Sequence, residues 1–371
     1  MAPIWAYVVL ALAIVTMSSG GVWFALMTET PPLMQACWRL SMTTVMQCFG
    51  VAYELHANKA TFDEAFWLRY RQSIPLLLSI GAGLAAYFGS WGWSVAHTSL
   101  LDSLLLVCTT PLLIVIVMTL RWLYRRFFPN RRQASVRLHQ STSAKETDAI
   151  LGSTPPVSLF EAIICPAVAL PPTWMEVCGA FVGFSGIIVL LASTPEVHSA
   201  SHQVTLAGNL SSLIGALVFI VYLEGGLICR KWMPLFLYSL SVTSVAAFDL
   251  AVASLLFEPS TSILGLGPSA LFGYFGDSQL FLLSFGAAFV AGFFGHACMN
   301  IAVVHVSTLL LAVCALWEPL IGSYMGYIAG VQDMPDSMTL IAAPLLLGGA
   351  LLVTLGGRQE YSTMIASEGD V

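Results

Sequence analysis

Several chemically active side chains lie inside long apolar stretches of the sequence. A charge is costly there, so ionisable residues in such stretches usually belong to substrate or proton pathways. We take them as the first candidates for a functional site, together with one amide and three neighbouring aromatic residues. The candidates are Arg39, Asp102, Glu224, Asp249, His296, Glu318, Asn300, Tyr222, Trp23 and Trp91.

Glu318 stands directly before Pro319. A proline removes a backbone donor and bends a helix, which frees a carbonyl group, and a carboxylate beside such a break suits a proton or substrate site. The alternative is a structural carboxylate that bonds to a neighbouring helix. His296 and Asn300 are four residues apart and share a helical face. Together with Glu318 they would form a polar strip in a cavity.

Arg39 lies about two helical turns inside its apolar stretch, by the 3.6-residue period. It would bind a substrate anion, pair with Glu29 or extend its charged end outward, and the sequence slightly favours the pairing. Trp23 and Trp91 either line an aromatic cavity or belong to the belt at the membrane surface. Glu224 follows Tyr222 and precedes a glycine pair, whereas Asp249 would equally serve as a hydrogen-bonding group between helices.

The composition requires a membrane around most of the chain. Of its 371 residues, 57% are hydrophobic and 9% are charged, whereas soluble domains carry about 25% charged residues. We count ten apolar stretches, each of which must be a helix in lipid. They are 3–26, 33–53, 73–96, 100–123, 174–193, 206–229, 234–257, 280–303, 306–330 and 338–357.

The distribution of charge predicts the orientation. If the N-terminus is cytoplasmic, thirteen of the fourteen Lys and Arg residues fall at cytoplasmic ends of spans, and Arg39 is the exception. This bias is typical of membrane proteins and places both termini in the cytoplasm. The only cluster of basic residues is one short loop, so we expect no nucleic-acid partner. We also expect no cofactor and no metal.

One stretch of sequence occurs twice. "VAHTSLLDSLLLVCTTPL" (95–112) and "VVHVSTLLLAVCALWEPL" (303–320) share six residues at a constant spacing of 208, including Pro111 and Pro319, which we expect to break their helices. We expect the linker between the copies to divide the chain into two five-helix repeats, 1–123 and 174–357. An odd number of spans inverts the second repeat, as in many secondary transporters.

The remaining segments are a linker and a tail. The linker, 124–173, is expected to be cytoplasmic and partly disordered, with its apolar run 157–170 on the membrane surface. "ETDAIL" (146–151) in the linker and "YSTM" (361–364) in the tail, 358–371, are similar to signals that bind sorting adaptors. They favour the plasma membrane or an endomembrane of a eukaryotic cell.

Three glycines follow the Glu–Pro pair at spacings of four. Gly322, Gly326 and Gly330 would make a flat helix face, which favours packing inside the protein, with a homodimer as the alternative.

The order of several motifs along the chain resembles a known family. "SSGGVWF", "CWRL", "AHTSLLDSLLLVCTTPL", "GNLSSLIGALVFIVYLEGGLICRK" and "WEPLIGSYMGYIAG" resemble segments of the drug/metabolite transporter superfamily, specifically its EamA-type members. The resemblance implies an all-α polytopic fold of ten transmembrane helices in two inverted repeats. Tyr124 and Gln332 depart from it, because members often have glutamate at about these positions.

These observations predict a secondary transporter of a small metabolite. The candidates named above include four acidic residues and one arginine, which favours a neutral, zwitterionic or cationic substrate, moved with protons. The alternatives are a nucleotide-sugar-type carrier of the same superfamily and a receptor or scaffold that transports nothing. We do not expect an enzyme, because the His97–Asp102 spacing found in some acyltransferases loses its acid in the second copy, at Leu310.

Overall fold

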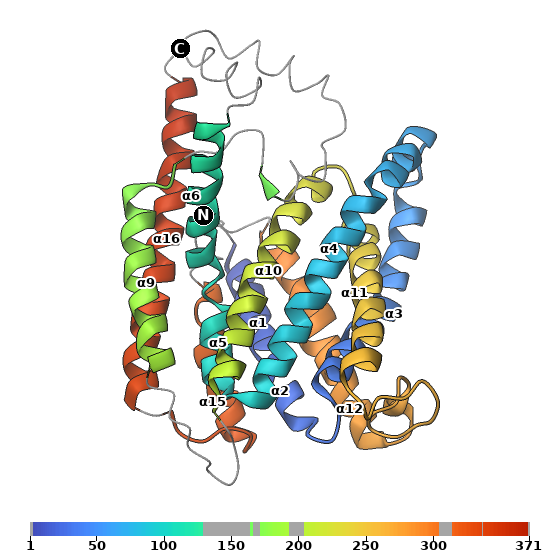
Figure 1. The fold of residues 1–371 in the computed structure, drawn as a ribbon. Helices are drawn as coiled ribbons and strands as arrows, with labels where there is room; N and C mark the ends of the chain where they lie inside the picture. Colours follow the sequence, from blue (N-terminus) through green and yellow to red (C-terminus); the bar gives the residue numbers. More distant parts are fainter. Residues whose placement is uncertain are drawn as a thin grey trace.

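The computed structural model describes residues 3–128, 164–165, 171–192, 204–303, 314–335 and 337–369. These residues form an all-helical bundle without a β-strand, and its long helices run side by side (Figure 1). The helices are α1 (Ile4–Ser18), α2 (Gly20–Leu26), α3 (Pro32–Ala57), η1 (Lys59–Thr61), α4 (Glu64–His97), α5 (Leu100–Val107), α6 (Thr110–Phe127), α9 (Trp174–Ala192), α10 (Leu206–Arg230), α11 (Leu235–Phe257), η3 (Gly273–Phe275), α12 (Ser278–Gly286), the π-helical η4 (Ala287–Phe294), α13 (Gly295–Val303), α15 (Glu318–Ile328) and α16 (Ser337–Gly369).

The chain is a multi-pass α-helical membrane protein. In its described part, eight helical segments are both long enough and apolar enough to cross a membrane. The helix α3 has 26 residues, but polar side chains such as Gln35, Thr43 and Gln47 keep it out of this group. The predicted span 306–330 is described in part, as α15, because residues 304–313 lie outside the described ranges.

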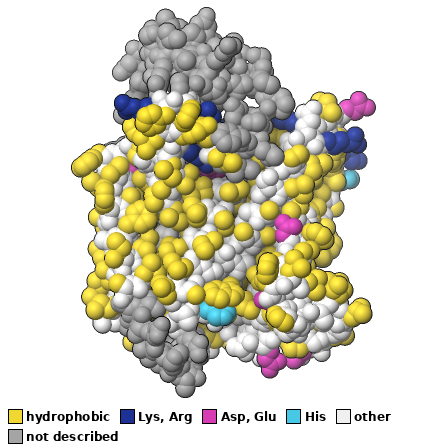
Figure 2. All heavy atoms as spheres, in the orientation of Figure 1, with side chains coloured by type: hydrophobic (Ala, Val, Ile, Leu, Met, Phe, Trp, Pro, Cys, Tyr) yellow, Lys and Arg dark blue, Asp and Glu magenta, His cyan; other side chains and the backbone are white. Residues whose placement is uncertain are grey.

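Large apolar side chains cover the outside of the bundle. Phe49, Phe181 and Phe248 expose 76%, 75% and 68% of their surface. Figure 2 shows an apolar belt between the two ends of the molecule, with the visible Lys and Arg side chains at the upper end. An apolar surface of this extent is stable in contact with lipid.

The helices pack in five pairs. The predicted repeat bounds, 1–123 and 174–357, hold four and six of the ten expected spans, so five spans on each side require α9 to be counted with the first half. Each pair then joins the two halves of the chain. The pairs are α1 with α13, α3 with α11, α4 with α10, α5 with α15, and α9 with α16. In the last pair the backbones approach closely, since a Cβ atom on Gly179 would lie 2.7 Å from the backbone nitrogen of Val353. Small residues permit such contacts in membranes, where packing rather than hydrophobicity holds helices together.

The α3–α11 pair is fixed at both ends by carboxylates. Glu54, in the last turn of α3, accepts hydrogen bonds from the backbone N–H groups of Phe236 and Leu237 at 2.9 and 3.0 Å. Glu258, just after α11, accepts one from the N–H of Leu33 at 2.8 Å. The first N–H groups of a helix have no partner within the helix. Each of these antiparallel helices therefore ends in a carboxylate that caps the start of the other.

Two of the expected spans are interrupted at equivalent places. The first breaks at Cys108 and Thr109, between α5 and α6, and the second breaks immediately before α15, which begins at Glu318. Pro111 and Pro319 are each the second residue of the helix that follows. Proline is favoured in a first helical turn because no N–H is required there.

Candidate functional site

The guanidinium of Arg39 is enclosed by aromatic rings. Arg39 is 5% exposed, and its Cζ atom lies 4.9 Å from the ring centroid of Phe88, 5.6 Å from that of Phe24 and 5.7 Å from that of Trp91. Its Nε and Nη1 atoms are buried and have no hydrogen-bond partner among the described residues. The favoured pairing with Glu29 is wrong, as is the outward extension, because Glu29 is exposed, whereas the guanidinium is buried and has no carboxylate partner among the described residues.

The break between α1 and α2 makes room for this arrangement. A Cβ atom on Gly20, the first residue of α2, would lie 3.1 Å from Nη1 of Arg39 and 3.4 Å from the Trp91 ring. The indole nitrogen of Trp91 is also buried and has no hydrogen-bond partner within the described ranges. A buried donor without an acceptor costs about 1–3 kcal/mol, and more when it is charged. Three N–H-bearing atoms that need an acceptor therefore lie in one neighbourhood.

A row of stacked rings leads away from Arg39. Trp91 stacks with Tyr87 at 6.3 Å between centroids, Tyr87 with Phe219 at 4.4 Å, and Phe219 with Tyr222 at 5.3 Å. The row connects α4 to α10 and places the predicted Trp91 and Tyr222 in one aromatic wall. Since Trp91 is buried, it does not belong to an interfacial belt.

Glu318, the first residue of α15, is half-buried near this wall. Its carboxylate is close enough for its charge to act on Tyr87 and on Cys108 at the other helix break, and the charge of Arg39 also reaches Tyr87. His296 on α13 interacts with Arg39 as well. We call Arg39, Tyr87, Trp91, Tyr222, His296 and Glu318 the central group. The side chain of Asn300 lies outside the described part of the structure.

The other predicted candidates lie elsewhere. Asp102 is buried in the first turn of α5 and accepts a hydrogen bond from Thr339 on α16 at 3.1 Å, so it connects two helices. Trp23 donates to Ser19 at 2.9 Å and packs against Gly286. Asp249 is partly exposed on α11, and its carboxylate has no hydrogen bond or ion pair with the described residues.

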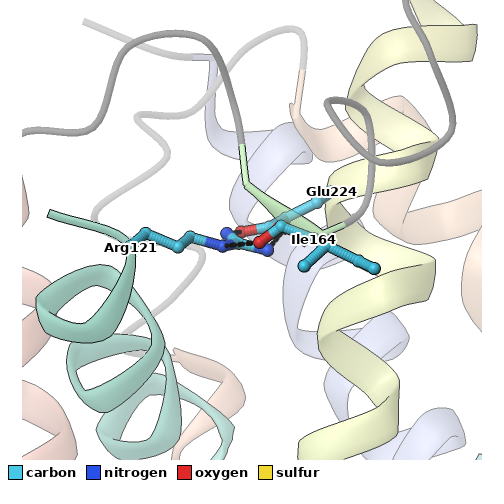
Figure 3. A network of polar contacts seen from close by, with 3 residues as sticks. All are labelled: Arg121, Ile164 and Glu224. Carbon is cyan, nitrogen blue, oxygen red and sulfur yellow. Dashed lines mark hydrogen bonds and ion pairs between the residues drawn. The ribbon is translucent and has the colours of Figure 1, made fainter. Parts of the chain in front are cut away.

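Glu224 is held by an arginine rather than facing the central group. Arg121 on α6 donates to both of its carboxylate oxygens, at 2.5 and 2.8 Å, and to the carbonyl oxygen of Ile164 at 2.6 Å (Figure 3). Arg125 donates to the carbonyl oxygen of Cys165 at 2.8 Å. The Arg121 and Glu224 side chains are 10% and 28% exposed. A bidentate ion pair therefore joins α6 to α10 near the basic end of the bundle, and the hydrogen bonds to Ile164 and Cys165 attach the linker to α6.

Comparisons with known proteins identify the fold alone. No family model matches the chain, and no curated protein matches it. The chain is similar to a solved structure described as "Crystal structure of protein", with a TM-score of 0.50 and 17% sequence identity over 96% of this chain and 98% of that chain. A likeness at this level of identity carries the arrangement of helices but no activity.

The glycines after Glu318 contact helices of the same chain. A Cβ atom on Gly322 would lie 2.7 Å from the carbonyl oxygen of Ser18, and one on Gly326 would lie 2.6 Å from Leu100. These two glycines pack inside the bundle, so they do not form a dimer face. Gly330 follows α15 with a φ of 73°, a backbone conformation that suits glycine, and nothing packs against it.

A pocket lies at the end of the bundle opposite to the Arg121–Glu224 pair. It has a volume of about 440 Å³ and lies between the turn before α3 and the segment after α11. Glu258 connects its two walls through the hydrogen bond to Leu33. The residues that line it are Thr28, Glu29, Thr30, Pro31, Pro32, Leu33, Trp93, Phe257, Glu258, Pro259 and Ser260.

Proposed function

We propose that the protein is a secondary transporter that moves a small metabolite across a membrane by alternating access. The observation that carries this proposal is the pair of helix breaks, 208 residues apart, beside Cys108 and Glu318. Transporter sites are typically built where discontinuous helices meet inside the membrane. A receptor or scaffold has no need for two matched breaks next to ionisable side chains.

The inverted repeat is part of the same proposal. With α9 as the fifth span of the first half, the expected spans correspond as α1 to α10, α3 to α11, α4 to α13, α5 to α15 and α9 to α16. This exchange leaves the set of five helix pairs unchanged. The capping carboxylates show the same symmetry. Glu54 accepts from the N–H of Leu237, and Glu258 accepts from the N–H of Leu33. Glu258 lies 204 positions after Glu54, and Leu237 lies 204 positions after Leu33. This supports ten spans with α3 and α15 included, as in EamA-type transporters, and termini in the cytoplasm.

The Arg121–Glu224 pair acts in this proposal as an inner gate. It joins α6 to α10 at the basic end, which the positive-inside bias assigns to the cytoplasm. The 440 Å³ pocket lies at the other end. The described conformation is therefore the one that is closed toward the linker.

Glu318 is assigned the proton or substrate contact in the central group. The test is uptake into proteoliposomes that contain the purified protein, with and without a proton gradient, over amines, amino acids, purines, vitamins and nucleotide sugars. We expect at least one compound to accumulate, and Glu318→Gln to abolish its gradient-driven uptake. Failure of every compound to enter or exchange would contradict transport and favour the receptor or scaffold.

The sorting signals and the plasma or endomembrane location remain predictions. The segment 146–151 lies outside the described residues, and 361–364 lies in the last turns of α16, where side chains are not described. Localisation of a tagged full-length chain, with and without the tyrosine of "YSTM", tests them.

A further inference from the structure

We propose that Arg39 and Trp91 bind the carboxylate of the substrate, and that the substrate is a small organic monocarboxylate with an apolar or aromatic body. This inference rests on the proposed function, because it assigns the ligand of the same central group. It starts from the absence of an acceptor for Nε and Nη1 of Arg39 and for Nε1 of Trp91 among the described residues.

The charge of Arg39 has no carboxylate partner in the described part of the protein. The groups that interact with it electrostatically are Tyr87 and His296, and neither type of side chain is ordinarily negative at neutral pH. Buried charges in proteins are paired, because removing an ion from water is costly unless an opposite charge compensates it. A negative group on a ligand supplies the missing partner.

The aromatic rings satisfy a different part of the guanidinium. Phe24, Phe88 and Trp91 lie 4.9–5.7 Å from its Cζ atom and offer the negative faces of their rings. The N–H groups, however, point along the edge of the guanidinium plane, where they need oxygen acceptors. A carboxylate matches that edge in shape and charge. The indole N–H of Trp91 provides one further donor near it.

The surroundings restrict the rest of the ligand. The stacked rings of Tyr87, Phe219 and Tyr222 continue from Trp91 and offer an apolar surface to the ligand body. The charge of Glu318 reaches Tyr87 in this wall, and a carboxylate there would repel a second negative group on the ligand and attract a positive one. One guanidinium does not neutralise a diphosphate, which disfavours a nucleotide sugar. A monocarboxylate, including a zwitterionic one, is compatible with the positive charge of Arg39 and with the negative charge of Glu318.

The experiment compares acids with their amides on the full-length protein in nanodiscs. The probes are phenylacetate and phenylacetamide, phenylalanine and phenylalaninamide, and leucine and leucinamide, each at millimolar concentration, with sodium chloride and sodium phosphate as inorganic anions. The readouts are the shift of the thermal midpoint and the change in tryptophan fluorescence. The variants are Arg39→Met and Arg39→Lys. The matched control is Arg69→Gln, since Arg69 lies 4.5 Å from the Trp232 ring but is exposed.

We expect at least one acid to raise the midpoint by several degrees while its amide does not. Arg39→Met should lose this shift. Arg39→Lys should need at least a tenfold higher concentration of the acid for the same shift, and Arg69→Gln should show the same shift as the wild type. The ligand-free Arg39→Met protein should melt no lower than the wild type, because it no longer buries an unpartnered charge. A structural arginine would instead leave Arg39→Met unfolded or much less stable.

Three results would overturn the inference. They are an amide that binds as well as its acid, an acid that Arg39→Met still binds, and a shift with chloride or phosphate but none with any acid. Uptake of an amine or a neutral compound into proteoliposomes would, in the last case, leave the transporter intact and reject the carboxylate alone. Absence of both binding and uptake would reject the proposed function itself.

Discussion

Glu54 and Glu258 occupy equivalent positions at opposite ends of one antiparallel helix pair. Glu54 closes α3 and caps α11, and Glu258 follows α11 and caps α3. Glu258 also accepts a hydrogen bond from the Ser254 hydroxyl at 2.5 Å. The reciprocal caps fix how far the two helices can slide past each other.

The caps predict matched losses of stability. Glu54→Gln and Glu258→Gln should each lower the free energy of unfolding by about 1–3 kcal/mol, because a charge-assisted hydrogen bond to backbone N–H groups is weakened. Thermal melting in detergent measures the effect. Glu29→Gln is the control. Glu29 is an exposed acid in the pocket that Glu258 also lines, and its substitution should change the midpoint little. Equal midpoints for all three variants would show that the caps contribute nothing.

Substitution of Glu318 should impair proton-driven uptake, whereas substitution of Asp249 should not. Glu318→Gln should abolish uptake driven by a proton gradient while exchange of substrate across the membrane continues, since exchange needs no net proton movement. Asp249→Asn should behave as the wild type, because Asp249 is partly exposed outside the central group. Paired assays of gradient-driven uptake and exchange in proteoliposomes decide this, and equal loss in both variants would contradict the assignment of Glu318.

The Arg121–Glu224 pair should control access from the linker side. Glu224→Gln removes one charge of a largely buried pair and should expose the central group to that side. In a chain with Cys108 as its single cysteine, labelling by a membrane-impermeant maleimide from the linker side should rise at least several-fold. The exchanged pair Arg121→Glu with Glu224→Arg should restore slow labelling. If labelling is unchanged in Glu224→Gln, the pair is not a gate.

The two prolines should matter for rate more than for stability. Pro111→Ala and Pro319→Ala give the backbone an additional N–H donor and make a continuous helix easier to form. We expect transport to slow several-fold while the thermal midpoint stays the same or rises. Pro75→Ala, in the uninterrupted helix α4, is the control and should leave the rate unchanged.

Much of the fold follows from apolar length and charge. The expected spans 73–96 and 206–229 lie within α4 and α10, because a backbone in lipid must bond within its own helix. The helix α3 is less apolar, since its polar side chains find partners inside the bundle. Gln35, for example, donates to the carbonyl oxygens of Met27 and Thr30 at 2.6 and 2.8 Å. Such partners cannot be read from hydropathy.

The candidate site was partly visible in the sequence. Intramembrane charge indicated Arg39 and Glu318, but whether a charge is paired depends on residues far away in the chain. Glu224 meets Arg121 across 103 positions, and Arg39 meets no carboxylate within the described ranges. Glu54 and Glu258 were missed because acids at span ends resemble solvated residues. Pro32 and Pro234, which mark the starts of the capped helices, were the available signal.

The enclosed guanidinium of Arg39 also has an electrical consequence. A membrane potential of 100 mV acts on one elementary charge that crosses it with about 2.3 kcal/mol. In the proposed transport cycle, a conformational change that shifts Arg39 along this field would therefore be sensitive to voltage when the protein is empty. A bound carboxylate cancels the charge, so the loaded protein changes conformation without that dependence. The resting membrane potential would then change the rate at which the empty protein reorients, and would not change the rate at which the loaded protein reorients.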